Sequence, residues 1–111
     1  MKRFSGAICI DQGLEVLFSD FQDGGPMWIG DGPREVRRSQ VFAAAFVGDP
    51  VVTVNLTMWD IDHKTNARID LSAENVTPLG FDIVLRTWGD TRIARVRAGW
   101  LAIGPGWEDD D

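Results

Sequence analysis

Hydrophobic and polar residues alternate with a period of two along most of this chain, and no stretch of a dozen residues keeps the period of a helix. The clearest alternation covers residues 51–59. Its apolar positions share one predicted inner face: Val52, Val54, Leu56 and Met58. Further strands are expected, in chain order, over residues 4–10, 15–19, 36–42, 67–76, 81–85 and 92–103. Several short strands without helices predict an all-β fold of the β-sandwich type.

Two segments fall outside this pattern. Residues 23–33 contain four glycines and two prolines, so we expect an irregular loop there, although it carries Met27 and Trp28. Residues 108–111 are all acidic and are expected to form a frayed, solvated tail. The remaining residues, 1–107, are expected to form one domain, because a chain of this length does not support a second core.

Composition and charge narrow the classes of function. The net charge of −6 opposes binding to DNA, RNA or anionic lipid, because such binding depends on basic side chains that neutralise phosphates. No apolar run is long enough to cross a bilayer. The short apolar patch near the N-terminus ends at Asp11, which favours a strand over a secretion signal. We therefore expect a soluble protein without membrane insertion; its compartment stays open, with an extracellular role among the options.

The residues needed for catalysis are scarce. Cys9 is the only cysteine and His63 the only histidine, so the chain offers no disulfide, no Cys/His pair and no zinc cluster. Cys9 stands between two isoleucines and is expected to be a small buried side chain. Asp60 and Asp62 either flank a turn or contribute to a calcium site. We predict a protein that is not an enzyme and needs no cofactor.

Tryptophan occurs where a core does not require it. Trp28, Trp59 and Trp88 stand in a loop or at strand ends, next to polar residues, whereas Trp100 belongs to the predicted inner face of the last strand. An exposed indole ring suits the C–H face of a sugar, and neighbouring Asp or Arg side chains suit its hydroxyls. Sugar binding is one interpretation of these positions; packing of turns onto the core is the other.

Residues 49–103 resemble the H-type lectin domain, which is found in snail agglutinins and at the C-terminus of slime-mould discoidins. The resemblance is carried, in order, by Pro50-Val51-Val52, Asp60, Asn66-Ala67-Arg68, Val76-Thr77-Pro78, Gly80-Phe81, Thr87-Trp88, Thr91 and Trp100. Ser5-Gly6, Asp31, Arg34-Glu35 and Phe42 extend it toward the N-terminus. The resemblance implies an antiparallel sandwich of six strands that forms a homotrimer, sometimes paired into a hexamer. It also implies a lectin, with galactose or N-acetylgalactosamine bound between protomers.

The resemblance further implies which residues bind the sugar. Asp31 and Arg68 would act from one protomer, and Trp88, Gly89 and Asp90 from its neighbour. Gly89 stands where the snail proteins have a histidine, and Trp28 is a candidate for a replacement aromatic. Alternatives remain open for the main residues. Arg68 would otherwise pair with nearby acids, Asp31 would order its glycine-rich loop, and Trp88 would pack at an interface between protomers.

Two functional hypotheses follow. The first is a multivalent lectin that binds glycans of the galactose type, for instance in cell adhesion. The second is a structural or interaction module, similar to an adhesin or a tail fibre, that keeps the trimeric scaffold and has lost sugar binding. The departure at Gly89 leaves both open.

Overall fold

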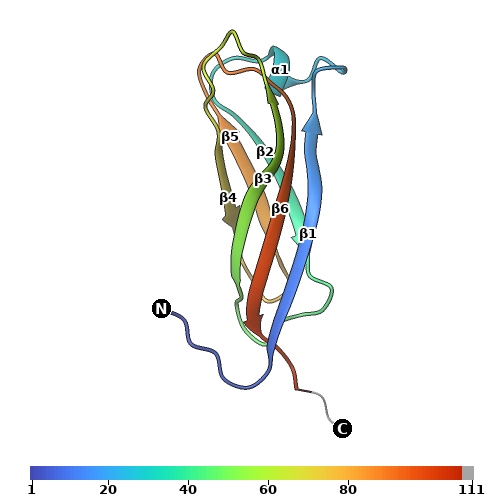
Figure 1. The fold of residues 1–111 in the computed structure, drawn as a ribbon, viewed down its shortest axis with the longest axis vertical. Coiled ribbons are helices and arrows are strands. Elements are labelled where there is room, and N and C mark those ends of the chain that lie inside the picture. Colours follow the sequence, from blue (N-terminus) through green and yellow to red (C-terminus); the bar gives the residue numbers. More distant parts are fainter. Residues whose placement is uncertain (109–111) are drawn as a thin grey trace.

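Six strands form two antiparallel three-stranded sheets that face each other (Figure 1). The structure, a computed structural model, describes residues 1–108. Its elements are β1 (Ile8–Ser19), α1 (Pro26–Ile29), β2 (Arg34–Val41), β3 (Val51–Ile61), β4 (Asp70–Glu74), β5 (Gly80–Thr87) and β6 (Ile93–Pro105). Sheet A has the strand order β1-β6-β3, and sheet B has the order β2-β5-β4. The predicted all-β antiparallel sandwich is confirmed.

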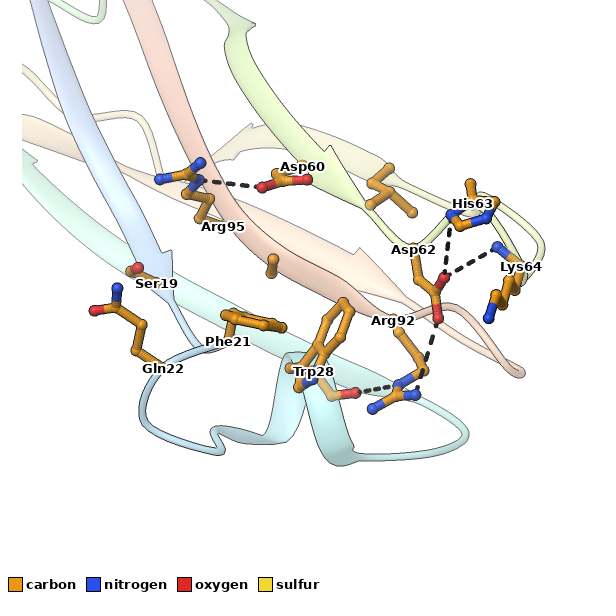
Figure 2. Close-up of a pocket in the computed structure, with 12 residues that line it drawn as sticks. Ser19, Phe21, Gln22, Trp28, Asp60, Asp62, His63, Lys64, Arg92 and Arg95 are labelled. Carbon is orange, nitrogen blue, oxygen red and sulfur yellow. Dashed lines mark hydrogen bonds and ion pairs between the residues drawn. The ribbon is translucent and has the colours of Figure 1, made fainter.

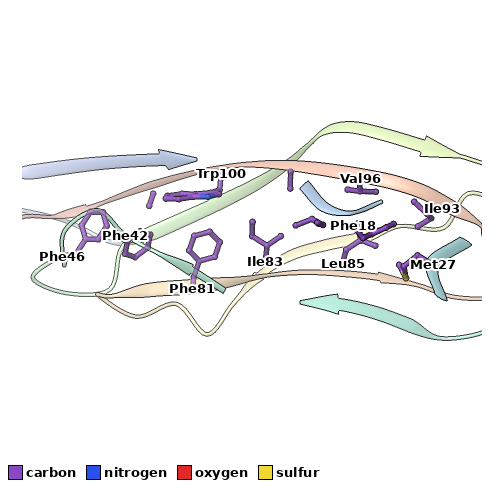
Figure 3. Packing of buried hydrophobic residues seen from close by; sticks show 13 residues of the cluster. Phe18, Met27, Phe42, Phe46, Phe81, Ile83, Leu85, Ile93, Val96 and Trp100 are labelled. Atoms are coloured by element: carbon purple, nitrogen blue, oxygen red, sulfur yellow. The ribbon is translucent and has the colours of Figure 1, made fainter. Parts of the chain in front are cut away.

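The core lies between the central strands of the two sheets (Figure 3). Sheet A contributes Val96, Ala98, Trp100 and Ala102 from β6, and sheet B contributes Phe81, Ile83 and Leu85 from β5. Trp100 is 8% exposed, which confirms its predicted place in the core. Its indole N–H donates to the Gln40 side-chain carbonyl at 3.2 Å, so the polar atom of this ring is satisfied across the sandwich.

The chain runs up and down the long axis, so that alternate loops gather at the same end. The loops that follow β1, β3 and β5 meet at the end opposite the N-terminus (Figure 1). We call this the distal end; it consists of residues 20–33, 62–69 and 88–92. Every residue predicted to bind sugar lies in one of these three segments.

The first strand differs from the prediction. In place of the two short strands expected over residues 4–10 and 15–19 there is one continuous strand, β1, which begins at Ile8, so residues 4–7 lie outside it. The polar residues that hid its continuity have specific partners: the Asp11 carboxylate accepts the Ala43 backbone N–H at 2.9 Å. Gly13 lies against Trp100, and a Cβ there would be 2.6 Å from the indole nitrogen. These contacts account for the break in the pattern.

The glycine- and proline-rich segment is not wholly irregular, contrary to the prediction. One helical turn, α1, begins at Pro26, which suits the first turn because it lacks an N–H. The Met27 N–H donates to the Asp20 carboxylate at 3.0 Å, and the Met27 side chain is 1% exposed. Burial of Met27 and this hydrogen bond fix the loop onto the core.

Two other predicted details are corrected. The strand expected over residues 67–76 is shorter, because residues 66–69 belong to the distal end and bond to its other loops. In β3, Val52, Val54 and Leu56 pack against the core as predicted. A bulge then shifts the register, so that Met58 pairs with the exposed Arg97 and lies outside the core cluster of the described residues.

Cys9 was predicted to be buried but is exposed near the edge of sheet A. It lies near the start of β1, an edge strand of sheet A, where it pairs with Gly104 of β6. The predicted acidic tail comprises residues 108–111. Of these, residues 109–111 lie outside the described residues. Within residues 1–108, no helix has the length and hydropathy to span a membrane.

The outer faces of the two sheets differ in character. Sheet A exposes apolar side chains: Ile8, Ile10, Leu14, Val16, Val51 and Leu101. Sheet B carries a network of ion pairs instead, in which Arg37 bonds to Asp82 at 3.0 Å and Arg86 bonds to Glu74 at 2.6 Å. The charged face is suited to water, whereas the apolar face is suited to a protein contact.

Candidate functional site

Arg68, Gly89 and Asp90 are in contact at the distal end. Arg68 Nη1 lies 2.6 Å from Asp90 Oδ1, and the Asn66 side-chain amide donates to the same carboxylate at 3.2 Å. The Arg68 guanidinium, helped by Asn66, holds the pKa of Asp90 below its ordinary value. Asp90 is therefore a carboxylate at neutral pH, and the Arg68 side chain, 34% exposed, is oriented by it.

Gly89 fits this cluster because of its backbone and its size. Its φ of +68° lies in the left-handed region that glycine adopts without strain. A Cβ at this position would lie 3.0 Å from Arg68 Nη1. Glycine therefore fits this position, where the snail proteins have a histidine, because the backbone conformation and the nearby Arg68 side chain both disfavour a larger residue.

Asp31 is brought to the same place by one backbone hydrogen bond. The N–H of Gly32 donates to the Gly89 carbonyl at 2.9 Å, which joins the loop after β1 to the loop after β5. Asp31 itself is exposed. Four of the six predicted sugar-binding residues thus lie on loops that are joined here, and we call them the charged group: Asp31, Arg68, Gly89 and Asp90.

Arg34 holds these loops together, a role that the sequence did not reveal. Its guanidinium donates to the carbonyls of Gly32 at 2.9 Å, Gly89 at 3.2 Å and Thr91 at 2.8 Å. It also reaches the carbonyls of Pro26 and Met27 in α1. The resemblance had marked Arg34 only as part of the family pattern. No local signal distinguishes such an arginine from one on an exposed strand.

Two buried threonines position the Arg68 backbone. The Thr91 hydroxyl donates to the Asn66 carbonyl at 2.5 Å and accepts the Arg68 N–H at 3.2 Å. The Thr87 hydroxyl donates to the Arg68 carbonyl at 2.5 Å. Both threonines are at most 2% exposed. Thr87 and Thr91 were noted in the sequence for their family pattern, and the structure supplies their physical role.

Trp88 lies apart from this group. Its side chain is 46% exposed and borders a separate shallow recess of about 340 Å³, formed with Pro33, Glu35 and Arg86. Neither Asp31 nor Arg68 lines that recess. Within one chain, therefore, the Trp88 ring does not share a hollow with the charged group.

Trp28 also lies in a recess of its own (Figure 2). It packs edge-to-face with Phe21 at 5.0 Å between ring centroids, and the Arg92 guanidinium lies 4.4 Å from the centre of its ring. The recess has a volume of about 650 Å³ and includes Asp60 and Asp62 but not Asp31 or Arg68. The predicted replacement aromatic thus belongs to a different hollow from the charged group.

Asp60 and Asp62, the two aspartates of this recess, both have partners within the protein. Asp60 pairs with Arg95 at 3.3 Å, and Asp62 accepts the backbone N–H of Lys64 at 3.0 Å. Among residues 1–108, no three His, Cys, Asp or Glu side chains are grouped so as to hold a metal ion. The interpretation that these two residues flank a turn accounts for the hydrogen bond that Asp62 accepts from the Lys64 backbone.

The model of the H-type lectin domain family matches residues 37–103, more than half of the chain. This protein belongs to that family. The match covers Arg68, Trp88, Gly89 and Asp90 but begins after Asp31 and Trp28. Membership places this H-type lectin domain among carbohydrate-binding lectins.

Relatives and solved structures agree with the assignment. The chain is 35% identical over 74 residues to one of the discoidin-1 polypeptides of Dictyostelium discoideum, covering 66% of this chain and 29% of the relative. A structure of wild-type discoidin II from the same organism superposes with a TM-score of 0.75 over 90% of this chain and 38% of that chain, at 21% identity. The H-type lectin domain described here spans about a third of these discoidins.

A third relative matches along the whole chain. It comes from Fuscovulum blasticum, is named "ATP synthase subunits region ORF 7", and is 59% identical over 111 residues, which is 100% of this chain and 96% of the relative. Its name describes no activity. The fold and family are thus shared by proteins of different length, one of them nearly coextensive with this H-type lectin domain.

Proposed function

We propose that this protein is a multivalent lectin that binds galactose- and N-acetylgalactosamine-type sugars through Asp31 and Arg68 at the distal end of a homotrimer. The observation that carries the proposal is the Arg68–Asp90 ion pair beside the Asp31 loop. In this proposal Asp31 accepts hydrogen bonds from sugar hydroxyls, and Arg68 donates to them. Charge-assisted bonds of this kind are the stronger ones available to a neutral sugar.

Asp90 contributes by orienting Arg68. The ion pair uses Nη1, and the structure records no hydrogen bond from Arg68 Nε or Nη2 to any of residues 1–108. Those two atoms remain available to a ligand. Gly89 and Asp90 lie beside Arg68 of the same chain, and in this proposal Trp88 of a neighbouring protomer closes the site, with its exposed ring against the sugar.

Assembly is part of the proposal because a single open site of this kind is weak. Two or three polar contacts and one ring at an exposed rim give a dissociation constant of about 1 mM. Several sites on one rigid assembly gain about 10²–10⁴ in avidity on a glycan-covered surface. The apolar outer face of sheet A supports contact between protomers, since the outer face of sheet B is occupied by ion pairs.

A glycan array compares wild type with Arg68→Ala and with Arg38→Ala as the control. Arg38 is exposed on β2, away from the distal end, and its guanidinium donates only to the neighbouring Arg37 carbonyl among the described residues. We expect binding to terminal galactose or N-acetylgalactosamine that is lost in Arg68→Ala and kept in Arg38→Ala. Equal binding by all three proteins would exclude the Arg68 site.

The second candidate is a trimeric interaction module that has lost sugar binding. It is favoured by Gly89, which offers no side chain to a ligand, and by Arg68, which already has an acidic partner. On the same array, this candidate predicts no glycan bound by wild-type protein that is folded and trimeric.

A further inference from the structure

The recess that contains Trp28 is a separate hollow at the distal end (Figure 2). It lies between the loop that carries α1, the C-terminal end of β3 and the start of β6. Its volume of about 650 Å³ is within the usual range of small-molecule sites, about 300–1,000 Å³. None of Asp31, Arg68, Trp88, Gly89 or Asp90 lines it.

One wall of this recess is aromatic and held in place. Trp28 and Phe21 pack edge-to-face, with a ring-centroid distance of 5.0 Å and an angle of 74° between the rings. Arg92 lies over the Trp28 ring, and its Nε donates to the Trp28 carbonyl at 2.9 Å. Phe21 is nevertheless 59% exposed. The wall is therefore preformed, and part of its aromatic surface faces solvent.

The other wall is polar: two acids and two arginines form ion pairs there, and the exposed Lys64 also lines the recess. Asp60 pairs with Arg95 at 3.3 Å, and Asp62 lies 3.9 Å from Arg92. Asp60 and Arg95 are both more than half exposed, so the atoms that pair are open to a ligand. In such a pair the carboxylate accepts a hydrogen bond from one sugar hydroxyl, and the guanidinium donates one to the next hydroxyl.

We propose that this recess is a second carbohydrate subsite, complete within one chain, that binds a neutral pyranose. The C–H face of the sugar packs on the exposed Phe21 ring beside Trp28, and adjacent hydroxyls bond to Asp60 and Arg95. A neutral ligand fits the part of the wall at Asp60 and Arg95, because these two side chains already pair with each other and a charged ligand would have to displace one of them. The inference rests on the proposed lectin function but needs neither Arg68 nor a trimer.

The test follows the indole N–H signals of ¹⁵N-labelled protein by NMR while methyl β-galactopyranoside or methyl α-mannopyranoside is added. The Trp28 signal is assigned with a Trp28→Phe variant. Titrations compare wild type with Arg68→Ala and with Asp60→Asn/Arg95→Gln. The matched control is Arg97→Gln, because Arg97 is exposed on the same strand, bonds to Thr57 at 3.0 Å and does not line the recess.

The expected result is a saturable shift of the Trp28 signal with at least one methyl glycoside in wild type, Arg68→Ala and Arg97→Gln. In Asp60→Asn/Arg95→Gln the dissociation constant should rise about tenfold or more, since charge-assisted hydrogen bonds are lost. A Trp28 shift that persists in Arg68→Ala while the array shows no Arg68-dependent binding would support the recess and refute the Arg68 site.

Three results would overturn the inference. Loss of every shift in Arg68→Ala would assign all binding to the Arg68 site and leave the proposed function intact. Equal dissociation constants for Arg97→Gln and Asp60→Asn/Arg95→Gln would show that Asp60 and Arg95 do not contact the sugar. Absence of any shift in wild-type protein that binds glycans on the array would also exclude a sugar at Trp28.

Discussion

Arg34 Nη2 lies 2.8 Å from the carbonyl oxygen of Thr91, and this hydrogen bond joins the start of β2 to the loop between β5 and β6. The same guanidinium reaches carbonyls of the α1 loop and of Gly89. One side chain thus satisfies backbone oxygens from separate stretches of chain. The planar fork of arginine makes this possible, because its five N–H groups point in fixed and different directions.

Replacing Arg34 should therefore destabilise the fold. We expect Arg34→Gln to lower the free energy of unfolding by about 2 kcal/mol, because partly buried carbonyls lose a charged donor. Arg34→Lys should recover little, since an ammonium group cannot span these segments. Urea denaturation measures both. Arg38→Gln is the control and should change the value by less than about 0.5 kcal/mol; similar losses for Arg34→Gln and Arg38→Gln would contradict the role of Arg34.

Gly89→Ala separates backbone strain from contact with Arg68. The positive φ should cost about 1 kcal/mol of stability, and the new Cβ should push Arg68 Nη1 from its place and weaken sugar binding. Gly24→Ala is the matched control, because Gly24 has a φ of +63° and open space around its Cβ position. Both variants should lose similar stability in urea. Only Gly89→Ala should bind less to the array, and equal binding by both would show that Arg68 tolerates the methyl group.

The sequence predicted the layers of this fold well because burial alternates in a regular sandwich. In β5, residues 81, 83 and 85 face the core, and so do alternate residues of β6. The strand predictions failed where a residue is determined by contact with a residue distant in the sequence. Gly13 interrupts the pattern of β1 because the Trp100 ring occupies the space of its side chain. The Thr57 bulge likewise shifts the register of β3 within a pattern that looks continuous.

The charged part of the candidate site was predictable only through the family resemblance. Nothing local indicates that Arg68 meets Asp90, since the two belong to different loops. Trp28 was grouped with them as a candidate replacement for the histidine that the snail proteins have at the position of Gly89. The turn of α1 directs the Trp28 ring toward Phe21 and Arg92 instead. Which way a loop side chain points depends on such tertiary contacts, and a sequence pattern does not encode them.

The apolar outer face of sheet A should control assembly. Leu14 and Leu101 are 68% and 37% exposed on neighbouring strands of this face. A Leu14→Glu/Leu101→Glu variant buries two carboxylates in any contact made there, so we expect the trimer to dissociate into monomers. Light scattering coupled to size exclusion gives the mass. Leu79→Glu, at an exposed leucine in the turn before β5, should leave it unchanged. A double variant that kept the wild-type mass would rule out this face.

Glu74 should make the stability of sheet B depend on acid. The Arg86 side chain is the main cause that lowers the pKa of Glu74 from 4.5 to about 2, with further help from Ser72 and Arg37. Because the folded-state pKa is depressed, the stabilisation is complete above about pH 4.5 and disappears as the pH falls toward 2. Unfolding in urea between pH 6 and pH 2 should show this loss in wild type.

In Glu74→Gln that part of the pH dependence should be missing, because a neutral amide has no proton to gain. Asp49→Asn, which changes a carboxylate outside the network, should keep the wild-type profile. The remaining loss in Glu74→Gln should come from Asp82, whose pKa is lowered first by Asn75 and then by Ser39 and Arg37, and from Asp90, whose pKa is lowered first by Arg68. Parallel profiles for wild type and Glu74→Gln would mean that the ion pair with Arg86 adds nothing. Sheet B would then owe its stability to apolar burial, including that of Val84, which is fully buried opposite Arg37.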